Sequence, residues 1–265
     1  YMDNKNLNKP FFTIITIVKN DETNIGKTIK SVLDQSFVDF EYIIIEGKSK
    51  DKTLQNIKKF SKKITYILSE KDSGIYFAMN KGVKLAKGQI LIFVNSGDLL
   101  TKNALKIIHK KFEKNTKIDF IFGTIKRNYT NTTIIKSGYN PLRLKYNFDF
   151  ATSHSTGFFI KLNSLKKVGK FNTKYKCSAD YDFYYRAIIK KKLLGTSTNK
   201  QQLIGIMKSG GYSSTISFID HLKEECLIRI NNGQNLFLII LIFLNAIIKN
   251  LFKVSILFIK KKIYI

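Results

Sequence analysis

Residues 69–100 decide the fold, and they read SEKDSGIYFAMNKGVKLAKGQILIFVNSGDLL. Residues 74–85 have apolar side chains at helical spacing, and Gly88, just beyond them, is predicted to stop that helix. Residues 89–94 form an apolar run typical of a buried strand, which stops abruptly at Asn95-Ser96-Gly97-Asp98. A helix followed by a buried strand with a polar end is typical of α/β proteins, whose ligands lie at the carboxyl ends of the strands.

The residues before this segment repeat the same pattern. Strands are predicted at residues 12–18, 42–45 and 64–68, separated by helical segments at residues 24–35 and 51–60. Strands that alternate with helices predict a largely parallel sheet. The first hundred residues are therefore expected to form one α/β unit.

The residues after 100 follow a more mixed pattern. Helices are expected at residues 103–112, from 163 and at 180–190, and strands at 120–123, 133–136, 158–160 and 203–207. A loop-rich stretch runs to residue 154, and residues 210–214 are either a mobile lid or a plain turn. The compact domain is expected to end near residue 215, where the composition changes and acidic residues soon cease.

The charge of the chain first suggests an anionic partner. The 46 Lys and Arg residues outnumber the 19 Asp and Glu residues in 265 positions, which gives a net charge of +27. However, only four of the basic residues are Arg, and a Lys-rich surface can simply be solvated. The two cysteines, Cys177 and Cys226, match neither a zinc site nor a disulfide framework, so a reducing compartment is expected. No apolar run precedes Phe11, so no secretory signal is expected there.

Acidic residues follow three neighbouring strands. Glu46 and Asp51 follow the second strand, Glu70 and Asp72 the third, and Asp98 the fourth. One such acid is usually a turn or cap residue, but three acidic strand ends indicate a ligand site. A carboxylate there can hold a divalent cation, which can in turn hold a diphosphate. This arrangement predicts a nucleotide-diphosphate ligand and argues against nucleic acid, whose phosphates the acids would repel.

With these residues in view, the sequence resembles the family 2 glycosyltransferases, enzymes of bacterial surface polysaccharide and lipopolysaccharide synthesis. The resemblance covers residues 11–214 and is most specific in the quoted block. Supporting segments are TIITIVKN (13–20), IIIEGKSKDKT (43–53), His154-Ser155-Thr156 and SADYDFYYR (178–186). It implies the GT-A fold, a Rossmann-like mixed sheet flanked by helices. Residues 11–100 would be the nucleotide-binding half of a 1–215 catalytic domain, and residues 101–215 the acceptor half.

The resemblance also implies residues for the donor. Thr16 and Val18 would lie near the base, and Glu46, where the family more often has Asp, would accept a hydrogen bond from a uracil or thymine imide. The remaining implied nucleotide-binding residues are Asp72, Asn80, Lys81, Asn95 and Ser96.

A divalent metal, Mg²⁺ or Mn²⁺, is implied as the cofactor. Its ligand would be Asp98, in a single-carboxylate variant of the family's Asp-x-Asp motif, with phosphate oxygens and waters completing the coordination. His154 would contact the metal or the diphosphate, or else be a structural histidine.

Asp180 and Asp182 are the predicted catalytic residues. They occupy the place of the family's acidic motif, where a carboxylate can remove the proton of an acceptor hydroxyl. We assign Asp180 as the base and Asp182 as the supporting acid, and one of the pair could instead cap the helix. Arg186, six residues after Asp180, is not at helical pairing distance from it. A single base and direct displacement predict an inverting hexosyltransferase.

The tail, residues 216–265, is expected to be a basic amphipathic helical region. Its apolar run at residues 236–248 is shorter than the roughly 20 residues that a membrane-spanning helix needs. Lysines at 249, 253 and 260–262 favour a peripheral position on the cytoplasmic face of the membrane. The alternatives are a helical hairpin docked on the catalytic domain or on a second copy of the chain, as in a homodimer.

The sequence as a whole predicts transfer of a sugar from a UDP-sugar or similar donor to a lipid-linked glycan. Two alternatives from other classes are a basic nucleic-acid-binding module and a glycoside hydrolase. Hydrolases also use paired carboxylates, but here the acids cluster in a nucleotide-type crevice.

Overall fold

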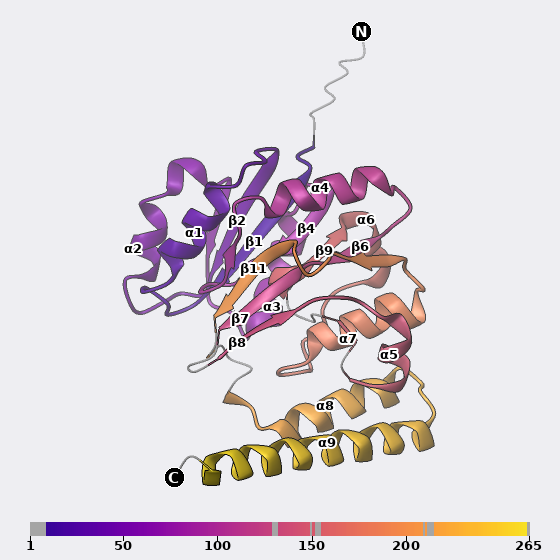
Figure 1. Ribbon diagram of the computed structural model, residues 1–265. Coiled ribbons are helices and arrows are strands. Elements are labelled where there is room, and N and C mark those ends of the chain that lie inside the picture. The colour runs from indigo at the N-terminus through magenta and orange to yellow at the C-terminus, as the bar shows by residue number, and fades with distance from the viewer. Residues whose placement is uncertain are drawn as a thin grey trace.

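The computed structural model describes residues 9–128, 132–148, 150–151, 155–208, 210 and 215–263, with side chains to residue 252. In this part of the chain, helices pack on both faces of a central sheet, and a second, smaller sheet lies beside it (Figure 1). The predicted α/β class and mixed sheet are confirmed.

The central sheet has seven strands in the order β10-β6-β9-β4-β1-β2-β3. β1, β2, β3 and β4 run parallel, whereas β9 runs antiparallel to both β4 and β6. The strands are β1 (Phe12–Val18), β2 (Phe40–Glu46), β3 (Tyr66–Ser69), β4 (Ile90–Phe93), β6 (Phe120–Phe122), β9 (Phe158–Lys161) and β10 (Gly195–Ser197). The carboxyl ends of β1, β2, β3 and β4 therefore meet at one edge of the sheet.

Each face of this sheet has its own core. Ile14 and Ile15 of β1 are both fully buried, and because successive side chains point to opposite faces, they belong to different clusters. One cluster includes α1 (Ile25–Leu33), α2 (Thr53–Lys58) and α4 (Ala104–Lys114), and the other includes α3 (Ile75–Leu85), α6 (Leu162–Val168) and α7 (Ala179–Tyr185). Burial on both faces explains the continuous apolar runs of the strands.

The predicted helix after residue 74 is present, but its end has another cause. The residue after the helix, Ala86, is extended, and Gly88 lies two positions further on. A Cβ atom at Gly88 would come within 2.6 Å of the backbone of Phe12 and Thr13. Gly88 is therefore a point of close approach to β1, not the residue that ends the helix.

The second sheet has the order β5-β11-β7-β8 and was only partly predicted. Its strands are β5 (Leu99–Leu100), β11 (Leu203–Lys208), β7 (Thr124–Asn128) and β8 (Thr133–Lys136). β5 follows the polar loop 95–98 directly and pairs antiparallel with β11. The loop at the end of β4 is thus held between the two sheets.

Two further helices complete the described chain, α8 (Phe218–Asn231) and α9 (Leu236–Ile263), which run along the bottom of Figure 1. α8 packs against α7, and Arg229 of α8 is fully buried. Its guanidinium donates to the carbonyl oxygens of Leu144 and Asn147 beside α5 (Pro141–Tyr146), at 2.8 and 2.5 Å. The helix after residue 215 is therefore docked on α7 and on the segment around α5. Within the described residues, no helix has the length and apolarity needed to cross a membrane.

Candidate functional site

The loop 95–98 at the end of β4 is held by hydrogen bonds on several sides. Asn95 Nδ2 donates to Ser155 Oγ (3.0 Å), and Ser96 Oγ donates to Asp21 Oδ2 (2.7 Å). The backbone N–H of Gly97 donates to Thr28 Oγ1 of α1 (2.9 Å). Because φ of Gly97 is +95°, a conformation that side chains disfavour, glycine suits this turn. The loop is therefore a fixed surface at the edge of the sheet.

Asp98 is buried in this loop, with 5% of its surface exposed. Its Oδ2 accepts a hydrogen bond from Thr156 Oγ1 (2.6 Å), and its Oδ1 accepts one from the backbone N–H of Lys208 (3.0 Å). Asp98 thus links β4 to the segment before β9 and to the end of β11. Both carboxylate oxygens are engaged with the protein, an arrangement typical of a structural acid.

The predicted metal position at this loop has one carboxylate, Asp98. Gly97 supplies no carboxylate, and both carboxylate oxygens of Asp98 accept hydrogen bonds from the protein. Among the described residues, no three His, Cys, Asp or Glu side chains gather where they could hold a metal ion. His154 lies outside the described residues. The metal role of Asp98 stays a prediction, and we derive no step through a metal.

Glu46 lies at the end of β2 and is fully buried. Its carboxylate accepts hydrogen bonds from the backbone N–H of Ser49 (2.5 Å) and from Ser69 Oγ of β3 (2.5 Å). Burial alone would raise the pKa of Glu46, but these hydrogen bonds outweigh it and hold the pKa below its ordinary value. Glu46 therefore stays ionised and ties the ends of β2 and β3 together.

Thr16 and Val18, predicted near the base, are buried in β1. Thr16 Oγ1 donates to the carbonyl oxygen of Val94 (2.8 Å) and shares a hydrogen bond with Tyr42 Oη (2.9 Å). Their nucleotide contacts stay predictions.

The residues predicted around the nucleoside form an ion-pair group. Lys81 Nζ lies 2.5 Å from Asp72 Oδ1 and 2.8 Å from Glu70 Oε1, which raises the pKa of Lys81. Asn80, the neighbouring residue of α3, uses its amide differently, because it accepts from the N–H of Phe171 and donates to the carbonyl oxygen of Phe171 (both 2.9 Å). Asn80 thus fixes the loop before α7, and its predicted approach to the donor stays a prediction.

Asp180 is half-buried in the first turn of α7. The hydroxyl of Tyr76 on α3 lies 3.4 Å from Asp180 Oδ1, and the backbone N–H of Tyr181 donates to the same oxygen (2.9 Å). Burial raises the pKa of Asp180 to about 6, against the lowering effect of these hydrogen bonds. A carboxylate with a pKa near 6 is ionised at neutral pH and more basic than an ordinary aspartate, as a general base requires.

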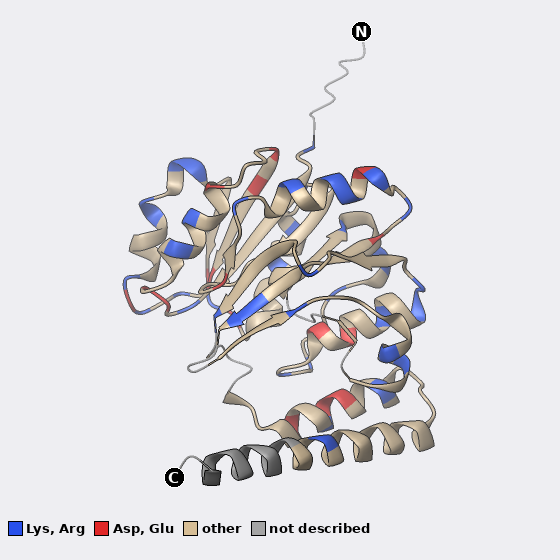
Figure 2. Ribbon diagram, viewed as in Figure 1, with Lys and Arg blue, Asp and Glu red and all other residues tan. Residues whose placement is uncertain are grey.

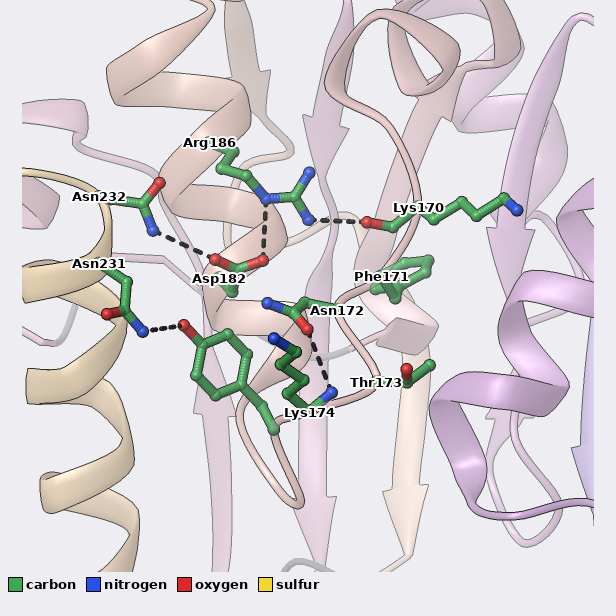
Figure 3. A pocket seen from close by; sticks show the side chains of 10 residues that line it. Lys170, Phe171, Asn172, Thr173, Lys174, Asp182, Arg186, Asn231 and Asn232 are labelled. Carbon is green, nitrogen blue, oxygen red and sulfur yellow. Dashed lines mark hydrogen bonds and ion pairs between the residues drawn. The ribbon is translucent and has the colours of Figure 1, made fainter.

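Asp182, two residues along, has a different environment. Its Oδ2 lies 2.8 Å from Arg186 Nε, one helical turn away, and its Oδ1 accepts from Asn232 Nδ2 of the α8 end (3.2 Å). These residues line a cavity of about 730 Å³ with the loop 170–175, and Figure 3 shows Asp182 between Arg186 and Asn232. The predicted nucleotide-binding residues do not line this cavity. Asp182 therefore holds α7 to its neighbours, and Asp180 does not line this cavity.

The helix α8 contributes residues that sequence patterns did not single out. The Glu224 carboxylate accepts from the backbone N–H groups of Lys176, Cys177 and Ser178, at 2.6 to 2.9 Å, directly before α7. Burial and the nearby charge of Asp180 raise the pKa of Glu225, the next residue, to about 8. Figure 2 shows acidic residues of α7 and α8 near one another below the sheet. The only sequence signal was that the last acids of the chain fall here.

The family model described as "Glycosyl transferase family 2" matches residues 13–179. The chain belongs to glycosyltransferase family 2. This match includes the strand-end loops of the glycosyltransferase and ends at the start of α7, so the family of the enzyme is shown.

Characterised and uncharacterised relatives agree with this family. An uncharacterized glycosyltransferase of Methanocaldococcus jannaschii is 26% identical over 193 residues, which cover 69% of this chain and 66% of the relative. A PGL/p-HBAD biosynthesis glycosyltransferase of Mycobacterium bovis is 26% identical, covering 81% of this chain and 84% of its own. A chondroitin synthase of Pasteurella multocida is 26% identical over 85% of this chain but only 23% of its own. The chain thus spans 66% of the length of the Methanocaldococcus jannaschii relative and 23% of the length of the chondroitin synthase.

Solved structures share the GT-A fold. S. aureus TarS (1–349) in complex with UDP-GlcNAc has a TM-score of 0.68 at 20% identity, covering 83% of this chain and 65% of that one. A mannosyltransferase of Pyrobaculum calidifontis in complex with GDP-Man and Mn²⁺ has a TM-score of 0.64 at 14% identity, covering 90% and 69%. At these identities the likeness establishes the fold alone.

Proposed function

We propose that this glycosyltransferase inverts the sugar that it transfers from a nucleotide-diphosphate donor, with UDP-sugars as the favoured class, to a hydroxyl of a lipid-linked glycan. The observation that carries the proposal is the Asp180 carboxylate, held at the start of α7 with a pKa raised to about 6. Asp182 beside it is already committed to Arg186, so it acts as the supporting acid that holds α7.

The reaction is a single displacement. The acceptor hydroxyl oxygen forms a bond to the anomeric carbon while its proton passes to Asp180 Oδ. The bond between the anomeric carbon and the diphosphate oxygen breaks at the same carbon, and its electron pair leaves with the nucleoside diphosphate. Attack from the face opposite the leaving group inverts the anomeric configuration.

The donor is proposed to lie along the carboxyl ends of β1, β2 and β4. Glu46, Asp72, Lys81, Asn95 and Ser96 are the described residues of this edge that we assign to it, with Thr16 and Val18 beneath. Solved relatives named above hold UDP-GlcNAc or GDP-Man, which supports a nucleotide-sugar donor for this fold.

The acceptor side is proposed to face a membrane through α9. Ile239 and Ile242 of this helix are buried, whereas Phe237, Leu244 and Leu251 on the other side are at least half exposed. Further exposed apolar side chains of α9 are Leu236, Ile240, Leu241, Ile248 and Phe252. No acidic residue follows Glu225, and Lys249 lies on this helix. An apolar face with cationic neighbours suits the headgroup region of an anionic membrane, where a lipid-linked acceptor would be found.

Donor turnover tests the enzymatic proposal. The full chain is incubated with UDP-, dTDP- and GDP-sugars, and release of the nucleoside diphosphate is measured with and without a membrane extract that supplies acceptors. We expect release from one nucleotide class, stimulated by the extract. Cleavage of a free glycan without any nucleotide sugar would favour a glycoside hydrolase, and binding of oligonucleotide in preference to nucleotide would favour the nucleic-acid module.

Vesicle binding tests the membrane proposal. Co-sedimentation with phosphatidylglycerol vesicles is expected for the wild type and weakened in a Phe237→Ser/Leu244→Ser variant. Val38→Ser is the matched control, because Val38 is 81% exposed in the loop between α1 and β2. A concentration-dependent dimer that the double variant abolishes, with no vesicle binding, would show that a second copy covers α9 instead.

A further inference from the structure

The diphosphate of the proposed donor needs positive charge at the end of β4. The loop 95–98 that would face it supplies one carboxylate, Asp98, which is buried and accepts hydrogen bonds at both oxygens. A carboxylate in this state is poorly placed to hold a cation against a phosphate. Another group must therefore compensate the charge.

Lys208 lies directly over this loop. It is the last residue of β11, and its backbone N–H is fixed by the hydrogen bond to Asp98. Its side chain crosses Gly97, since a Cβ atom at position 97 would lie 2.9 Å from Lys208 Cδ and 3.4 Å from Lys208 Cβ. Any side chain at position 97 would displace the lysine. Glycine at position 97 gives the loop no carboxylate at this position, and it leaves space for the side chain of Lys208.

The neighbouring strand adds to the positive charge. β11 pairs with β7 in parallel, with Ile206 opposite Lys126 and Lys208 opposite Asn128. Aligned residues of parallel strands share a face, so Lys126 and Lys208 lie on the same face of the second sheet. The acids at this loop are Asp98 and Asp21, and Asp21 Oδ2 would be 3.8 Å from that Cβ atom and already accepts from Ser96 Oγ. Both acids already accept hydrogen bonds from the protein, whereas the side chain of Lys208 lies over Gly97.

We propose that the ammonium group of Lys208 binds the diphosphate of the donor above Gly97, so that nucleotide binding does not require a metal ion held by the loop 95–98. The proposal rests on the proposed function, because it names how that site holds its donor. Lys208 is then a diphosphate-binding residue. A flexible, solvated ammonium can follow the diphosphate as the leaving group departs.

Calorimetric titration of the full chain with UDP, dTDP and GDP, in EDTA and in MnCl₂, tests the proposal. For the preferred nucleotide, we expect wild-type affinity to change less than about threefold between the two conditions. Lys208→Gln should lower affinity about tenfold or more in both, the loss of one charge-assisted contact, and Lys208→Arg should restore most of it. Lys167→Gln is the control, because Lys167 is exposed on α6, which follows β9 at the opposite edge of the sheet.

The outcomes separate the two proposals. Nucleotide binding that disappears in EDTA, returns with Mn²⁺ and is unchanged in Lys208→Gln would overturn the role of Lys208 and leave the proposed function standing. Absence of binding to every nucleotide in both conditions would overturn the proposed function and this role with it. A lower melting temperature in Lys208→Gln with unchanged nucleotide affinity would show that Lys208 only supports the loop, and would equally overturn the proposal.

Discussion

The proposed donor edge, which is the edge where the carboxyl ends of β1, β2, β3 and β4 meet, and the first turn of α7 use carboxylates in opposite ways. At the donor edge, Glu46 and Asp98 are buried but accept hydrogen bonds at both oxygens, and the pKa of Glu46 is lowered. In the first turn of α7, Asp180 is half-buried with a long contact to Tyr76, and its pKa is raised to about 6. At the donor edge, hydrogen bonds from the protein therefore stabilise the ionised carboxylates. In the α7 turn, burial destabilises the ionised form of Asp180.

This difference indicates which carboxylate is expected to act as the general base. A carboxylate whose ionised form is satisfied by the protein stabilises the fold and has little basicity to offer. A carboxylate whose ionised form is penalised by burial accepts a proton readily. The same criterion separates Asp180 from Asp182, whose carboxylate is paired with Arg186.

The largest expected effect concerns Asp180→Asn, which keeps the shape of the side chain and removes its basicity. Turnover should fall about 10²- to 10⁴-fold, the contribution of a positioned general base, with nucleotide affinity nearly unchanged. Wild-type kcat/KM should fall as the pH drops below about 6, because Asp180 becomes protonated there. Asp34→Asn, in an exposed acid after α1, is the control. Near wild-type turnover of Asp180→Asn would remove the distinction between the two regions.

The next effect concerns the docking of α8 below the α7 turn. Arg229→Met should lower the free energy of unfolding by roughly 2 to 6 kcal/mol, about 1 to 3 kcal/mol for each buried carbonyl oxygen, of Leu144 and of Asn147, that loses its donor. Urea denaturation measures the change, and Arg143→Met, on the exposed side of α5, should change it little. A loss below about 1 kcal/mol for Arg229→Met would show that α8 is not part of the folded core.

The two acids of α7 should then change stability in opposite directions. Asp182→Asn should cost about 3 kcal/mol, since it leaves Arg186 without its carboxylate, while turnover stays close to wild type. Asp180→Asn should instead stabilise by roughly 2 kcal/mol at pH 7. Its folded pKa is raised, so the wild type loses stability as the pH rises from the unfolded pKa towards 6, and the advantage of the variant should vanish near pH 3.

Thermal or urea unfolding of both variants at pH 3.5, 5 and 7 checks these signs. A dead Asp182→Asn enzyme beside an active Asp180→Asn enzyme would move the base by two residues.

The smallest expected effect is at the donor edge. Glu46→Gln should cost about 1 to 2 kcal/mol at neutral pH, because an amide accepts less strongly from Ser49 and Ser69. The folded pKa of Glu46 is lowered, so the wild-type advantage is present above the unfolded pKa and is lost as the pH falls through the folded pKa. Glu113→Gln, in a surface pair with His109 on α4, is the control and should change stability little. An equal response of the two variants would mean that the hydrogen bonds to Glu46 do not stabilise its ionised form.

The α/β class, the first four strands, the strand-end acids and the family are predictable from the amino-acid sequence alone. These features are local, because a strand buried on both faces must read as a continuous apolar run, and a loop at its end must read as polar. The choice of Asp180 as the base also came from its motif and its place at a helix start, and the raised pKa agrees with that choice.

The surroundings of these residues depend instead on contacts between distant parts of the chain. β5 and β10 are short strands of two and three residues whose partners are distant in sequence, so no periodicity predicts them. The contacts of Asp98 with Thr156 and Lys208 join positions 58 and 110 residues apart. Docking of α8 depends on Arg229, which in sequence is one of many basic residues but in the fold is a buried donor to a distant loop. Whether a buried charged group is hydrogen-bonded depends on partners that come together only when the chain folds. Composition and residue spacing do not predict these partners.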